Sequence, residues 1–205
     1  SPTRDGTAVA DRLAGILEED GFTVQRVDAG WSKAPAVVVC HDSGKPGRGI
    51  QFNGHLDTVH LPFVPPRVED GVLYGSGCSD MKGGVAAMCE AMRAFRDAAG
   101  LPGGRVLMTA HELHESPWGD GSQVDGLIDA GHLADGVMLP EYHCANLPVV
   151  GRGLAILRVT VRREGEEVHE VLGGIEQPSV IYAGAELLLK LREMDRALSV
   201  NKHPL

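Results

Sequence analysis

Short apolar runs alternate with helical patterns along most of the chain before residue 140. Apolar residues recur at helical spacing over residues 8–17 and 82–99, which predicts two amphipathic helices. A shorter helix is predicted over 125–130. Runs rich in β-branched and apolar residues predict strands at 22–27, 36–40, 49–52, 72–74, 105–110 and 136–139. This succession predicts an α/β fold, with a mostly parallel sheet flanked by helices.

The pattern changes after Gly151. Residues 155–163 alternate apolar and polar side chains, as an antiparallel strand with one solvated face does. Residues 179–191 have the periodicity of an amphipathic helix. We therefore expect a larger α/β domain over residues 1–150 and the start of a smaller α+β domain over residues 151–205.

Charge and composition narrow the class of protein. The net charge of -9 over 205 residues disfavours nucleic acid as a partner, because phosphate neutralisation needs clustered Lys and Arg. The four cysteines form no C-x-x-C pair, which is typical of free thiols in a reducing compartment. No stretch is long and apolar enough to span a membrane, and no leader pattern opens the chain. We expect a cytoplasmic protein that binds neither nucleic acid nor membrane.

Side chains of the kinds that bind metal ions gather in two short segments. Residues 53–59 read N-G-H-L-D-T-V and place His55 and Asp57 just after a predicted strand. Residues 75–84 read G-S-G-C-S-D-M-K-G-G and deliver Asp80 from a glycine-rich turn at the start of a predicted helix. Imidazole and carboxylate are ligands of zinc-class ions, and open α/β sheets bind ligands at strand ends.

Together these two segments resemble the M20 family of metallopeptidases and amidohydrolases, through G-H-x-D-T-V and G-x-G-x-x-D-M-K-G-G. The resemblance implies a zinc-peptidase-like catalytic domain over residues 1–150 and a lid or dimerisation domain from residue 151. It also implies two divalent metal ions, zinc first, with cobalt or manganese as substitutes. Three carboxylates would offset the charge of two such ions.

By the same resemblance, the metal ligands sit at the ends of strands. They are His55, Asp80, Glu115 and Glu141, with the Asp bridging both ions. His55 and Glu141 would complete the coordination of one metal ion, and Glu115 would be a ligand of the other. Asp57 matches the Asp that holds the histidine imidazole in one tautomer. The family's last ligand, a His, has no counterpart before Leu205.

Residues 111–117, H-E-L-H-E-S-P, depart from the family pattern of two adjacent glutamates, a general base followed by a ligand. Extending the predicted strand without a gap puts His114 on the base position and Glu115 on the ligand position. A shifted register would put Glu112 on the base position and Leu113 on the ligand position, which the chemistry of Leu rejects. His114 is therefore either a substitute base, since neutral imidazole accepts a proton, or a sign of altered or lost activity.

His169 ends a G-x-x-x-H segment that matches the lid domain of the family. The resemblance implies that His169 reaches the active site of a second subunit and hydrogen-bonds the oxyanion of the tetrahedral intermediate, so a homodimer is expected. A surface histidine after an acidic turn fits Glu166 and Glu167 equally well.

The expected function is metal-dependent hydrolysis of an amide bond in a small molecule, an N-acyl amino acid or a small peptide, as in a deacylase or desuccinylase. A dipeptidase or carboxypeptidase of the same family is the alternative within this class. A catalytically silent domain for metal binding or oligomerisation is the alternative outside it.

Overall fold

A central five-stranded sheet organises the larger of two compact units, Ser1–Leu147 and Pro148–Leu205. The computed structural model describes residues 5–59, 62–98, 101–115, 117–141, 158–164 and 179–200. The strands of the central sheet lie in the order β1, β2, β6, β3, β7. Their bounds are β1 Val24–Val27, β2 Ala36–Asp42, β3 Ile50–His55, β6 Arg105–His111 and β7 Gly136–Met138.

The strand directions confirm the predicted mostly parallel sheet. Strand β3 pairs in parallel with β6 on one side and with β7 on the other. Strand β2 is antiparallel to both β1 and β6, so it alone among the strands of this sheet runs against the others. The carboxyl ends of β3, β6 and β7 consequently meet at one edge of the sheet, where α/β proteins place their sites.

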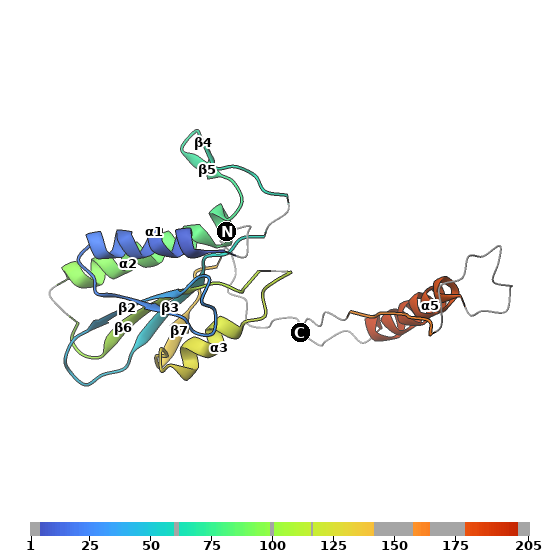
Figure 1. The fold of residues 1–205 in the computed structure, drawn as a ribbon. Helices are drawn as coiled ribbons and strands as arrows, with labels where there is room; N and C mark the ends of the chain where they lie inside the picture. Colours follow the sequence, from blue (N-terminus) through green and yellow to red (C-terminus); the bar gives the residue numbers. More distant parts are fainter. Residues whose placement is uncertain are drawn as a thin grey trace. The chain divides into compact units, whose positions relative to one another are not determined.

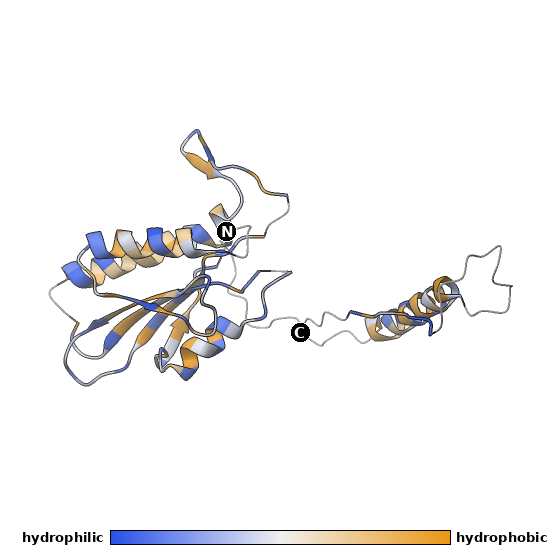
Figure 2. Cartoon of the chain, in the orientation of Figure 1, coloured by the Kyte–Doolittle hydropathy of each residue, from blue (hydrophilic) through white to orange (hydrophobic). Residues whose placement is uncertain are grey.

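Helices cover both faces of this sheet (Figure 1). Helices α1 (Thr7–Glu19) and α2 (Gly83–Asp97) lie side by side over one face, and α3 (Ser122–Asp129) lies over the other. Successive residues of a strand point to opposite faces, and the two cores follow that alternation. The first core combines both long helices with Val37, Val39 and Met108, and the second combines Val38, Leu107 and Leu127. Figure 2 shows hydrophobic residues along the central strands.

The sequence predicts only one strand of a hairpin that lies outside this sheet. Strands β4 (Arg67–Glu69) and β5 (Val72–Tyr74) pair antiparallel around Asp70 and Gly71, both of which have positive φ. An Asp-Gly turn of this kind matches the twist of paired strands. Every residue of both strands is exposed, so β4 lacks the apolar pattern that marks a buried strand.

The smaller unit is described mainly through helix α5 (Val180–Ser199), which is longer than the predicted 179–191. The hydroxyl oxygen of Ser179 caps it by accepting the N–H of Tyr182 at 3.4 Å. Residues 158–164, which overlap the predicted strand 155–163, lie in no helix or strand. A strand requires hydrogen bonds from a neighbouring strand, and no strand among the described residues pairs with this segment. The start of that predicted strand and His169 lie outside the described residues.

None of the helices in the described part of the chain is both long and apolar enough to cross a membrane.

Candidate metal centre

His55 ends β3 and is fully buried, with its two ring nitrogens facing different partners. The Nδ1 atom lies 3.0 Å from the backbone oxygen of Asp57 and 3.3 Å from its Oδ1 atom. A carbonyl oxygen only accepts, so Nδ1 carries the proton and donates. The Nε2 atom is left to face Asp80, whose Oδ1 lies 3.0 Å away. Two ligands of a tetrahedral zinc ion lie roughly 3.4 Å apart, so this nitrogen and oxygen are spaced as ligands of one ion would be.

Asp80 reaches the site from the glycine-rich turn that its motif predicts, just before α2, and not from the end of a strand, where the resemblance places the full ligand set. It belongs to the irregular segment η1 (Cys78–Lys82), between β5 and α2. The φ and ψ angles of Asp80 and Met81 depart from helical values, and their peptide bond is cis. The placement of Asp80 at a strand end is therefore wrong, whereas the turn that the glycine-rich segment predicts is present, with positive φ at Gly75 and Gly77.

His114 and Glu115 follow β6 and are attached to Asp57 through their backbone. Leu113 has a φ of 61°, in the left-handed region, and turns the chain where the strand ends. The N–H groups of His114 and Glu115 then both donate to Oδ2 of Asp57, at 3.0 and 2.7 Å. Asp57 thus connects the loop after β3 to the loop after β6.

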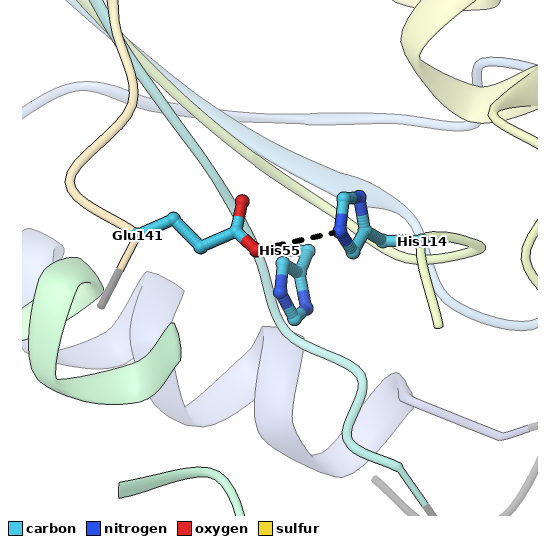
Figure 3. A group of neighbouring side chains, drawn as sticks. All are labelled: His55, His114 and Glu141. Atoms are coloured by element: carbon cyan, nitrogen blue, oxygen red, sulfur yellow. Dashed lines mark ion pairs between the residues drawn. The ribbon is translucent and has the colours of Figure 1, made fainter. Parts of the chain in front are cut away.

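Glu141 follows β7, and Gly84 of α2 allows its segment to come close. A Cβ atom at Gly84 would collide with the carbonyl oxygen of Pro140. The Oε1 atom of Glu141 lies 3.9 Å from Nε2 of His114, too far for a hydrogen bond (Figure 3). The ring of His114 stacks on that of His55, with centroids 4.1 Å apart and planes 11° from parallel.

The four predicted ligands therefore converge, together with His114. Ligand-type atoms lie within 4.8 Å of one another in two groups that share His55, one with Asp80 and Glu115 and one with His114 and Glu141. The ligand roles of these residues stay a prediction.

The electrostatics of the cluster fit a divalent cation. The Oε1 atom of Glu115 is buried and has no hydrogen-bond partner among the described residues. Burial, and then the nearby carboxylate of Asp80, raise the pKa of Glu115. Among the residues that the structure describes, no Lys or Arg forms an ion pair with Asp80, Glu115 or Glu141. A buried carboxylate oxygen without a donor is costly, and a metal ion at this position would remove that cost.

His55 and Asp57 have displaced pKa values because of each other. Burial disfavours the charged imidazole and is the largest single influence on His55, yet Asp57 and Asp80 together outweigh it and raise its pKa. Burial likewise opposes ionisation of Asp57. The contact with His55 and the N–H groups of Glu115 and His114 outweigh it, so the pKa of Asp57 is lowered.

Three further polar residues lie near the site, and of these the sequence singles out Glu112 alone, as the base in the shifted register. His111 is buried at the end of β6, where burial lowers its pKa to about 4, and its Nδ1–H donates to the backbone oxygen of Glu112. Burial raises the pKa of Glu112 to about 7. The ammonium of Lys82 donates to the hydroxyl of Thr58. The only sequence signal for His111 is a histidine that ends an apolar strand shortly before the predicted base.

The chain belongs to Peptidase family M20/M25/M40, whose sequence profile matches residues 51–189, more than half of its length. This confirms the resemblance inferred from the two metal-site motifs.

Among curated relatives, the succinyl-diaminopimelate desuccinylase of Verminephrobacter eiseniae is 34% identical over 145 residues, which are 60% of this chain and 36% of the relative. That of Acidiphilium cryptum is 31% identical over 186 residues, 86% of this chain and 46% of the relative. The chain thus spans less than half the length of these relatives.

Solved structures share the fold at lower identity. Human carnosine dipeptidase 1 matches with a TM-score of 0.50 and 21% identity, over 65% of this chain and 32% of that one. An M20 family metallo-carboxypeptidase from Sulfolobus solfataricus matches with a TM-score of 0.51 and 20% identity, over 64% of this chain and 31% of that one. These similarities confirm the α/β fold with flanking helices.

Proposed function

We propose that the protein hydrolyses amide bonds of small N-acyl amino acids or peptides with the help of bound divalent metal ions. The observation that carries the proposal is the convergence of His55, Asp80, Glu115 and Glu141 around a buried carboxylate oxygen that has no donor in the described part of the chain. Residues 1–150 would supply part of the metal-binding catalytic domain, and residues from 151 the start of a lid or dimerisation domain.

Two zinc ions, for which cobalt or manganese could substitute, would suit these oxygen and nitrogen ligands. When bound, such ions polarise the substrate carbonyl and lower the pKa of the attacking water. His55 would bind through Nε2, because its Nδ1–H is already directed to Asp57. Asp80 offers two carboxylate oxygens and lies beside both His55 and Glu115, so it would hold a metal ion together with them.

His114 would accept a proton at its ring and would not share an ion with His55. A histidine lone pair lies in the plane of its ring. Since the rings of His55 and His114 are stacked and nearly parallel, their nitrogen lone pairs are directed in separate parallel planes and would not converge on one ion. The Nε2 atom of His114 remains beside Glu141, within the cluster, and its side chain is 42% exposed. A ring so placed can take the proton of an attacking water and release it to solvent.

His169 would stabilise the oxyanion across a homodimer interface, an assignment that rests on the sequence match alone. A cytoplasmic location rests on the cysteine pattern. Both belong to the same proposal.

N-succinyl amino acids are the first substrates to test, because the relatives described above are named desuccinylases. A dipeptidase or carboxypeptidase would use the same site on an unblocked peptide. Both classes of substrate are offered to the protein at equal concentration, so the ratio of kcat/KM values decides between them.

The test measures bound metal and turnover on the same preparations. Metal-stripped protein is reconstituted with zinc, cobalt or manganese and assayed on N-succinyl amino acids, N-acetyl amino acids and dipeptides. We expect turnover that appears with metal and disappears with a chelator. Stoichiometric metal without turnover on any substrate would favour the silent metal-binding alternative, and no bound metal would refute the site.

A further inference from the structure

The carboxylate and the backbone of Asp57 contact different parts of the site. Its backbone oxygen accepts the Nδ1–H of His55 at 3.0 Å, whereas its Oδ1 atom lies farther away, at 3.3 Å. That Oδ1 atom is buried and has no hydrogen-bond partner among the described residues. Its Oδ2 atom accepts two backbone N–H groups, those of His114 and Glu115. The hydrogen bonds of the carboxylate therefore go to the loop after β6.

This division of contacts differs from what the resemblance implies, in which the carboxylate holds the histidine tautomer. A backbone carbonyl fixes the Nδ1–H tautomer as well as a carboxylate does, because both only accept. The peptide oxygen also stays in place when the side chain of Asp57 is changed.

We propose that the Asp57 carboxylate is a positioning group for His114 and Glu115, and that the Asp57 peptide oxygen fixes the tautomer of His55. The inference rests on the proposed function for its catalytic consequence, and on the hydrogen bonds alone for its structural part.

The loop after β6 has a physical need for such an anchor. Leu113, immediately before it, has a φ of 61°, which a non-glycine residue adopts only when its surroundings enforce it. Two hydrogen bonds to one charged oxygen are among the stronger interactions available to backbone N–H groups. Without them His114 and Glu115 would be free to move away from the cluster. A displacement of about 1 Å is enough to cost a large part of catalysis.

The decisive experiment is NMR of the isotope-labelled protein without metal, comparing the parent with Asp57→Ala. We expect the amide protons of His114 and Glu115 to move strongly upfield, because they lose a charged acceptor. The ring nitrogens of His55 should keep the pattern of an imidazole that carries its proton on Nδ1. Asp135→Asn is the matched control: Oδ2 of Asp135 accepts the N–H of Gly49 at 2.6 Å, at the other end of β3. It should shift Gly49 and leave the site unchanged.

Either of two results would overturn the inference: unmoved amide protons of His114 and Glu115 in Asp57→Ala, or loss of the Nδ1–H tautomer of His55. If Asp57→Ala does not fold, Asp57→Asn replaces it, since the amide protons of His114 and Glu115 then also lose a charged acceptor and should move upfield.

Kinetics give the functional half of the test. Asp57→Ala should lower kcat about 10- to 100-fold, while KM changes far less, because positioning of reacting groups is lost and substrate contacts are kept. A parent protein without metal-dependent turnover would refute the proposed function and leave the NMR result to decide the role of Asp57.

Discussion

Replacing His114 by Ala separates the two roles that its position in the cluster allows. As a proton acceptor it should contribute a factor of about 10²–10⁴ to turnover, which corresponds to about 2.7–5.4 kcal/mol of activation free energy. As a ligand it would contribute to metal affinity as well. The stacked geometry with His55, at 11° between the ring planes, favours the first role.

The fold should survive this substitution. The His114 side chain is 42% exposed, and it lies 3.9 Å from Glu141 and against the ring of His55. A stacked ring pair contributes about 0.5–1.5 kcal/mol, a minor part of the stability of a domain. The attachment to Asp57 uses the backbone N–H of residue 114, so Ala retains it. Loss of turnover can therefore be attributed to the ring.

The assay pairs steady-state kinetics with a metal titration on the same samples. His114→Ala should lose turnover at unchanged metal affinity, and His114→Glu, which restores the residue type of the family, should recover it. His132→Ala serves as the control, a histidine after α3 whose backbone oxygen faces Gln51 away from the site. Parental turnover in His114→Ala would refute the reasoning and direct attention to Glu112. A loss of metal in His114→Ala would instead identify His114 as a ligand.

Three further predictions concern the titrating groups and the second subunit. Metal affinity should fall as pH drops, because binding requires deprotonated His55 and Glu115, and both groups have raised pKa values without metal. Isothermal titration calorimetry should show that metal binding releases more protons as the pH falls below the raised pKa of His55. An affinity that does not depend on pH would contradict this prediction. Glu112→Gln should raise the melting temperature most above pH 7. The pKa of this carboxyl rises from 4.5 to about 7 on folding, so its ionisation destabilises the folded state increasingly as pH rises through that interval. A difference in melting temperature between variant and parent that is the same at pH 5 and pH 8 would contradict this prediction. Mixed His114→Ala and His169→Ala proteins should recover part of the activity if His169 acts across a dimer, and no recovery after demonstrated subunit exchange would mean that it does not.

The sheet could be predicted because burial imposes a pattern on the sequence. Strands β2, β3 and β6 are largely buried on both faces and therefore read as apolar runs. The hairpin strand β4 is exposed throughout and has no such pattern. The reversed direction of β2 could not be predicted either, because a buried strand has the same apolar composition whether it runs parallel or antiparallel to its neighbours.

The residues that meet in the cluster could also be predicted, whereas the path of the chain between them could not. His55 and Asp80 stand in motifs whose residue types the chemistry of a metal ion requires. The turn at Leu113 has a positive φ in a residue that rarely adopts one, and tertiary contacts enforce it. Because that turn ends the alternation of β6, side-chain spacing beyond it no longer indicates which residue faces the site. Counting along an uninterrupted strand places His114 at the base position. The structure brings the same residue to the cluster by another route, through a turn anchored on Asp57.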